Sequence, residues 1–147
     1  LVLYACPNPR DQYKATFASI KELVNLVERK AKGYSLHQEV MSNIQRSKGT
    51  TYVVDFDFDL GTVTDRQEQL NEILKQSESF INRDCLSVIE TRGGYHILVH
   101  PDRIQKEFKA KWYQGFTSIP GLDQAGDQLL PVPGTTQGNF VPKMIKI

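Results

Sequence analysis

The chain has 147 residues, of which 39% are hydrophobic and 24% charged, values typical of one globular domain. This composition excludes collagen-like, disulfide-scaffold and largely disordered chains. The net charge is only +1, so any contact with a polyanion must come from local basic patches. No apolar run approaches the ~20 residues that span a bilayer, and no signal peptide is visible at the start. We therefore expect a cytoplasmic protein without membrane contact.

The two cysteines, Cys6 and Cys85, lack the spacing of a redox or zinc motif. We interpret both as small buried hydrophobic residues in a reducing compartment. The three histidines also lack zinc-binding spacing, so a zinc site is not expected.

The first fifty residues predict a strand at Val2–Ala5 and two helices. A first helix that ends at Gly33 is expected from apolar residues at near-helical spacing: Phe17, Ile20, Val24, Val27 and Ala31. A second, shorter helix is expected from Leu36 to Ile44. We interpret residues 1–50 as an N-terminal α/β extension of a single domain that covers 1–147.

From Thr51 the pattern changes to alternating strands and helices. Thr51–Phe58 predicts a strand, and the following helix is expected to begin at the N-cap Thr64, with Gln67 at the capping-box position. A hairpin is then expected from Leu86–Glu90 and Tyr95–His100, joined by a Gly-rich turn.

Pro101 opens a further predicted helix, with Ile104, Phe108 and Trp112 four residues apart. The remaining predictions are a loop and two strands: a loop at 115–126 and strands at Leu129–Val132 and Phe140–Ile147. The resulting β-α-β-β-α-β order predicts an α+β fold, an RRM-like or ferredoxin-like antiparallel sheet with helices on one face. Right-handed crossovers place the first and third strands at the centre and the fourth beside the first.

The strongest chemical pattern is the alternation of aspartate and phenylalanine from Asp55 to Asp59. On a strand, the phenylalanines point to the helices and the aspartates to the open face, with Asp55 and Asp57 roughly 6–7 Å apart. Such carboxylates can hold two divalent cations ~3.5–4 Å apart, which clamp a phosphoryl transfer. A solvated polar face is the alternative, although aspartate is depleted in strands and stacked like charges are unfavourable.

The predicted topology brings further polar residues to the same edge of the sheet. His96 lies at the start of the third strand and faces the late part of the first. Asp123 and Asp127 precede the predicted fourth strand and return to this edge. At the hairpin turn, Gly94 allows a close backbone approach and Arg92 suits phosphate oxygens, with an ordinary turn as the alternative.

These residues resemble the archaeo-eukaryotic primase superfamily, which includes primase small catalytic subunits and the primase-polymerases of plasmids, phages and mobile elements. Three motifs carry the resemblance: Val54-Asp55-Phe56-Asp57, Gly94-Tyr95-His96 and Leu122-Asp123. The stretch Gln128–Thr135, with Lys143 downstream, resembles the family's Pro-Gly-Ser/Thr stretch and lysine, and Asn8–Arg10 resembles a primase-polymerase segment. The resemblance covers most of residues 51–143.

The resemblance implies a DNA primase or polymerase, a nucleotidyltransferase that adds nucleotides from NTP or dNTP on a single-stranded or primed DNA template. It implies a site for two Mg²⁺ or Mn²⁺ ions, with these ligands: Asp55, Asp57 and the late aspartate, Asp123 or Asp127. The implied nucleotide-binding residues are Arg92, Gly94, His96 and Lys143. The implied catalytic set is Asp55, Asp57, Asp123 and His96.

The chain departs from the family pattern near its C-terminal end. Gln128 and Pro131 flank two leucines where the family often has an arginine, which weakens the expected triphosphate grip. The sequence carries neither a zinc-binding knob nor a helicase domain, so we expect priming to need a helicase or a further replication domain as partner.

Local basic clusters predict nucleic-acid contact, with a solvated helix face as the alternative. The candidate residues are Arg10, Lys106, Lys109 and Lys111. Two other functions stay open at this stage. A metal-dependent nuclease would use the same aspartates without nucleotides, and a non-catalytic RRM-like module would bind nucleotides or single strands without metal.

Overall fold

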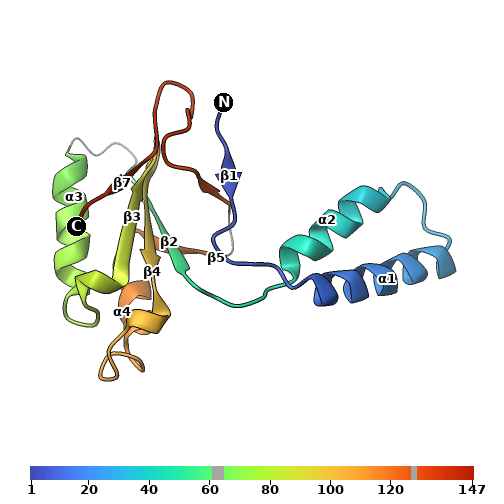
Figure 1. Cartoon of the computed structure of the whole chain (residues 1–147), viewed down its shortest axis with the longest axis horizontal. Coiled ribbons are helices and arrows are strands. Elements are labelled where there is room, and N and C mark those ends of the chain that lie inside the picture. Colours follow the sequence, from blue (N-terminus) through green and yellow to red (C-terminus); the bar gives the residue numbers. More distant parts are fainter. Residues whose placement is uncertain (61–64, 127–128) are drawn as a thin grey trace. The chain divides into compact units, whose positions relative to one another are not determined.

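A computed structural model of the chain describes residues 1–60, 65–126 and 129–147 (Figure 1). The chain divides into two compact units, which are described separately. The sheet unit comprises residues 1–7 and 52–147, and the helical unit comprises residues 8–51. Residues 1–7 therefore belong with the sheet, although the sequence pattern groups them with the N-terminal helices.

The sheet unit is an α+β structure built on a five-stranded antiparallel sheet of order β5-β2-β4-β3-β7. Its strands are β2 (Val54–Asp59), β3 (Leu86–Glu90), β4 (Gly94–Val99), β5 (Leu122–Gly126) and β7 (Lys143–Ile145). The central strand β2 pairs with β4 and β5, and β3 pairs with β4 and β7. The predicted fold class is confirmed, because β2 and β4 lie at the centre with β5 beside β2.

The sheet unit contains two α-helices and two short 3₁₀ turns in its described residues. They are α3 (Arg66–Ser77), α4 (Trp112–Thr117) and the single 3₁₀ turns η1 (Arg83–Cys85) and η2 (Pro101–Arg103). The Asp65 carboxylate accepts a hydrogen bond of 2.9 Å from the backbone N–H of Glu68 and caps α3. The expected N-cap, Thr64, lies outside the described residues. None of the helices in the described ranges has the length and apolar character needed to cross a membrane.

The main core lies between α3, α4 and one face of the sheet, and α3 follows that face in Figure 1. Its side chains are at most 7% exposed, and the largest of them are Phe56, Phe58, Leu70, Tyr95, Ile97 and Phe116. The Phe56 and Phe116 rings lie 4.9 Å apart between centroids. Because β2 alternates, Phe56 and Phe58 point into this core and the aspartates point to the other face.

The other face of the sheet is partly covered, whereas the sequence predicts it to be open. A short ribbon of β1 (Tyr4–Ala5) and β6 (Leu130–Pro131) contributes Leu130 to a small apolar cluster. The cluster also contains Val53, Ile89 and Leu98. The sequence predicts strands at both places, Val2–Ala5 and Leu129–Val132, but their pairing with each other joins segments that are far apart in the chain, so periodicity does not reveal it.

The helix predicted from Pro101 to Trp112 is wrong, because α4 begins only at Trp112. The backbone of Ile104 is extended and ends η2, which places its side chain in the core at 4% exposure. Turns follow, in which the N–H of Phe108 donates to the carbonyl of Gln105 at 3.0 Å. Consecutive turns, and not a helix, therefore place Ile104 and Phe108 against the core.

The predicted loop at 115–126 is also wrong, because it contains part of α4 and the strand β5. The strand beside β2 is β5, while the expected fourth strand, Leu129–Val132, contains β6 and pairs with β1. Leu122 anchors β5 opposite Phe58 and is 6% exposed. One apolar anchor in a polar segment leaves no alternation by which a strand can be recognised.

The helical unit consists of α1 (Gln12–Glu28) and α2 (Leu36–Arg46). The Asp11 carboxylate caps α1 through the N–H of Lys14, and the hydroxyl of Ser35 caps α2. α1 ends before the predicted Gly33, because the chain turns at Lys30, whose φ is 48°.

Candidate functional site

A polar row crosses the three strands β4, β2 and β5, on the face of the sheet away from the main core. In the strand register, Asp57 lies directly opposite His96 on one side and directly opposite Asp123 on the other. Directly opposite residues share a face, with Cα atoms about 4.5–5.5 Å apart. The three residues are therefore neighbours, although Asp123 lies within β5 and not before a strand.

Asp55 lies two residues before Asp57 and is buried, with 2% exposure. Both of its carboxylate oxygens lie 3.2 Å from His96 Nδ1, and Asp57 Oδ1 lies 3.8 Å from the same nitrogen. A buried carboxylate requires such a partner. Asp55 thus fixes the orientation of the imidazole ring through Nδ1.

Burial and charge shift the pKa values of this row. Burial raises the pKa of Asp57, and the negative charges of Asp59 and Asp55 add to this effect while His96 opposes it. For His96, burial favours the neutral ring, but the hydrogen bond to Asp55 and the aspartate charges outweigh burial and raise its pKa. The row is therefore a place where added positive charge is favourable.

The row fits a divalent cation by donor type, because Mg²⁺ and Mn²⁺ prefer carboxylate oxygens such as those of Asp57 and Asp123. The side chains are not, however, gathered around one point. In residues 1–60, 65–126 and 129–147, no group of three His, Cys, Asp or Glu side chains is arranged to hold a metal ion. The third expected ligand, Asp55, is engaged by His96, and Asp127 lies outside the described residues.

Gly94 and Arg92 lie at the turn beside the end of β2. Gly94 pairs with Asp59, and a Cβ atom at Gly94 would overlap the carbonyl oxygen of Phe58. Strand pairing therefore requires this glycine, whether or not a ligand binds. Arg92 borders a hollow of about 340 Å³ that is also lined by Gly138, Asn139 and Phe140.

Lys143 is not brought to the row. Its Nζ lies 3.2 Å from a carboxylate oxygen of Glu90, which also pairs with Arg66 at 3.2 Å. Ile145, two residues further along β7, packs against the main core, so Lys143 shares the helix-covered face. This placement follows from the pairing of β7 with β3, which the β-α-β-β-α-β pattern does not include.

The basic candidates for nucleic-acid contact are divided between the two units. Lys106, Lys109 and Lys111 are exposed in the turns before α4. Arg10 belongs to the helical unit, where its backbone forms a β-bridge with Lys48.

Sequence reasoning missed Gln137, which joins the turn at Arg92 to the N-terminal segment. Its side-chain oxygen accepts from the Arg92 N–H at 3.2 Å, and its amide group donates to the Tyr4 hydroxyl at 3.2 Å. The nearby Thr135 hydroxyl accepts from the backbone N–H of Leu3 at 3.3 Å. The Pro-Gly-Thr loop therefore holds residues 1–5 in the sheet unit, through contacts between segments about 130 residues apart that no local motif reveals.

Comparisons of this chain with protein-family models, with curated proteins and with solved structures found no match.

Proposed function

We propose that the sheet unit is the catalytic core of a divalent-metal-dependent nucleotidyltransferase, a DNA primase or polymerase like those of the superfamily that its motifs resemble. The observation that carries this proposal is the row of Asp123, Asp57 and His96 across adjacent strands. Carboxylates beside an imidazole on one sheet face supply the donor types that a divalent cation and a phosphate group require. The substrates are an NTP or dNTP and a nucleic-acid 3′-hydroxyl on a template.

Each residue of the row has a distinct task in this proposal. Asp57 and Asp123 would hold Mg²⁺ or Mn²⁺, which would neutralise charge on the triphosphate. Asp55 is a positioning residue, because it orients His96 and favours its protonated form. The imidazolium then donates to a phosphate oxygen, and Arg92 offers a second cationic contact at the neighbouring turn. Charge stabilisation and alignment supply most of the rate acceleration.

The proposal includes the cellular setting expected from the sequence. We propose a cytoplasmic location and a helicase or further replication domain as partner, because the resemblance places such catalytic domains in replication systems.

A non-catalytic module that binds nucleotides or single strands is the second candidate. One observation favours it: the Asp55 carboxylate is buried against His96, and no three-ligand metal group forms among the described residues. In that case the Asp55–His96 pair stabilises the sheet, and binding needs no metal. The nuclease alternative has no comparable support in the described part of the chain.

The decisive experiment is calorimetric titration of the full chain with a dNTP, in the presence and absence of Mn²⁺. Wild type is compared with Asp57→Asn and with the matched control Asp102→Asn. Asp102 is exposed on η2, which follows β4 at the end of the strand opposite Gly94. We expect Mn²⁺-dependent binding by wild type and the control, and binding weaker by about tenfold or more in Asp57→Asn. Template-dependent extension in the same proteins should follow the same order.

Three results would contradict the transferase proposal. Equal Mn²⁺-dependent nucleotide binding by wild type and Asp57→Asn would show that the row does not bind the metal and nucleotide. Binding of single-stranded DNA without metal, and without nucleotide binding, would favour the binding module. Cleavage of DNA in the absence of nucleotides would favour a nuclease.

A further inference from the structure

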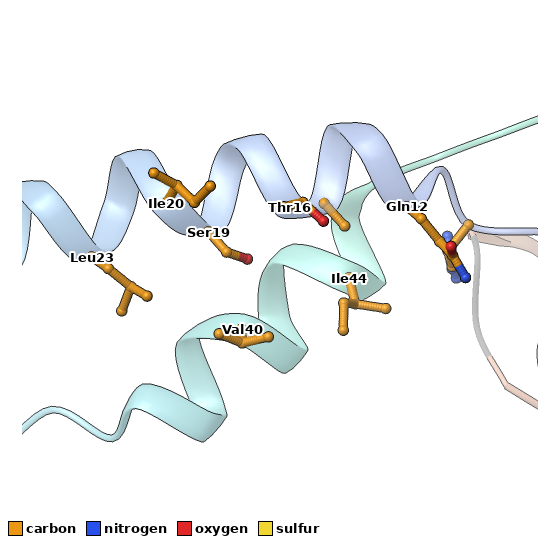
Figure 2. Close-up of a pocket in the computed structure, with 9 residues that line it drawn as sticks. Gln12, Thr16, Ser19, Ile20, Leu23, Val40 and Ile44 are labelled. Carbon is orange, nitrogen blue, oxygen red and sulfur yellow. The ribbon is translucent and has the colours of Figure 1, made fainter.

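An apolar groove runs between α1 and α2 in the helical unit (Figure 2). Its volume is about 560 Å³. The apolar lining comes from Ile20 and Leu23 of α1 and from Val40 and Ile44 of α2. A second hollow of about 270 Å³, lined by Leu23, Val24, Val27 and Glu28, continues along α1. Because both hollows share Leu23, they form one apolar track.

The two helices bury little of their own apolar surface. The buried residues of α1 are Ala15 and Ser19, and α2 has none. Four large apolar residues on α1 are 50–74% exposed: Phe17, Ile20, Val24 and Val27. Helices in proteins are stabilised mainly by packing of their apolar face. The apolar face of α1 is therefore suited to an additional packing partner.

The Ser19 hydroxyl is a second, independent feature of the groove. Ser19 is 7% exposed, and its hydroxyl oxygen has no hydrogen-bond partner among the described residues. Figure 2 shows this hydroxyl directed between the helices toward α2. Burial of a hydroxyl without a partner is unfavourable. An occupant that supplies a polar atom at this point would relieve that cost.

The dimensions and charge of the helical unit indicate what kind of occupant fits. The lining of the two hollows extends along α1 from Gln12 to Glu28, about 24 Å at 1.5 Å per residue, which is a little over four helical turns. Residues 8–51 contain eight basic and four acidic residues, a net charge of +4. A long partner with an apolar face flanked by acidic residues therefore matches both properties.

We propose that this groove binds an amphipathic helix of a partner protein, with apolar anchors at i, i+3 or i+4 and i+7 and acidic residues flanking that apolar face. A helix laid in a groove between two helices completes a three-helix arrangement and buries their shared apolar surface. Arg10 lines the groove near the start of α1 and provides a cationic contact for an acidic side chain. The groove lies entirely in the helical unit, so the inference goes beyond the proposed nucleotidyl transfer.

Single-stranded nucleic acid is a less suitable occupant, although the positive charge would attract it. Such strands are usually held by aromatic side chains on which the bases stack. The residues that line the two hollows include no aromatic ring.

The test uses the full chain and a fluorescein-labelled amphipathic peptide of about 18 residues, with leucine on one helical face and glutamate at the positions that flank it. A second peptide carries lysine at every glutamate position. Thr16→Glu and Ile20→Glu each place a carboxylate in the groove at exposed positions that the fold tolerates. Gln45→Glu is the matched control, because Gln45 is exposed on α2 and does not line either hollow.

We expect wild type and Gln45→Glu to bind the acidic peptide with equal, micromolar affinity in fluorescence anisotropy. Thr16→Glu and Ile20→Glu should bind it more weakly by about tenfold or more, and the lysine peptide should bind wild type more weakly by a similar factor. Far-UV circular dichroism that matches wild type confirms that the variants are folded.

Each of three outcomes would overturn the proposal. The first is the absence of acidic-peptide binding by wild type at about 100 μM, or equal binding by the groove variants. The second is a dimer in analytical ultracentrifugation that Ile20→Glu abolishes, which assigns the groove to a second copy of this chain. The third is binding of a single-stranded oligonucleotide that Thr16→Glu and Ile20→Glu abolish, which assigns it to nucleic acid.

Discussion

Helices α1 and α3 have similar apolar periodicity and different surroundings. In α3, Leu70, Ile73 and Leu74 are 0–4% exposed and pack against the sheet. In α1, Ile20 and Val24 remain 58% and 50% exposed at equivalent spacing. Periodicity thus reports which face of a helix is apolar, whereas burial depends on whether another element covers that face.

This contrast predicts that the sheet unit carries most of the chain's stability. Its core unites residues from four strands and two helices, and the rings of Phe56, Phe116 and Trp112 pack edge to face or tilted. Burial on that scale stabilises a domain through the hydrophobic effect and close packing.

The largest expected effect is the difference between equivalent truncations in the two helices. Leu70→Ala should lower the free energy of unfolding by about 2–5 kcal/mol, because it opens a cavity in a fully buried site. Ile20→Ala should change it by less than about 0.5 kcal/mol, because Ile20 is mostly exposed. Urea unfolding followed by the fluorescence of the single tryptophan, Trp112, measures the first effect, and circular dichroism measures both. Similar losses of unfolding free energy in Leu70→Ala and Ile20→Ala would contradict the inferred difference in burial between α3 and α1.

Close packing in the sheet unit should extend to the β3–β4 turn. Gly94→Ala should cost about 1–3 kcal/mol, because the added Cβ overlaps the Phe58 carbonyl and separates β2 from β4. Gly93→Ala is the matched control, since its nearest neighbour, Asp59 Oδ1, is 3.7 Å away. Thermal unfolding should show a lowered Tm for Gly94→Ala and an unchanged Tm for Gly93→Ala. An equally low Tm for Gly93→Ala would show that overlap with the Phe58 carbonyl is not what destabilises Gly94→Ala.

Substitution of the helix caps tests the difference between α1 and α3 further, because a cap is a local interaction that does not depend on which element covers the helix. Asp65→Ala removes the cap of α3 and should cost about 1 kcal/mol, while Asp65→Asn should be nearly neutral because asparagine also caps. Asp11→Ala removes the equivalent cap of α1 and should lower helix content by circular dichroism. Because α1 has less tertiary packing, Asp11→Ala should lower the helix content more than Asp65→Ala does. A larger loss of helix in Asp65→Ala would contradict the inferred difference in packing between α1 and α3.

The smallest expected effects are the pKa shifts of two histidines in the sheet unit. The pKa of His100 should lie below its ordinary 6.5, because burial and Arg103 disfavour the charged ring. The pKa of His96 should lie above 6.5, because Asp55 and its neighbours outweigh burial. The His96 contribution to stability is therefore complete below pH 6.5 and is lost as the pH rises through the higher folded pKa.

NMR titration of the imidazole protons measures both histidines in one experiment. In Asp55→Asn, the pKa of His96 should fall, because burial then lacks its main opposing interaction. An unchanged His96 pKa in Asp55→Asn would mean that the Asp55 carboxylate does not hold the ring in solution.

The hairpin and the aspartate strand were predictable because their patterns are local. Leu86–Glu90 matches β3, and the alternation around Asp57 correctly separates core phenylalanines from outward aspartates. The neighbourhood of Asp57 and His96 follows from that alternation together with the handedness of the crossovers.

Other features depend on contacts between distant segments and leave no local pattern. Among the residues of β5 whose burial is described, Leu122 is the buried anchor, and the strand resembles a loop in sequence. Lys143 faces Glu90 because β7 adds to the edge of the sheet at β3.

The sequence alone determined the class of fold, the strand that carries the aspartates and the apolar faces of the helices, because periodicity and turn chemistry act over a few residues. The tertiary structure alone decided that Asp55 is buried against His96, that Asp123 lies opposite Asp57, and that the apolar face of α1 is left exposed. Burial, strand register and pairing are set by which distant segments meet, and a helix or strand with a given apolar face can meet several partners.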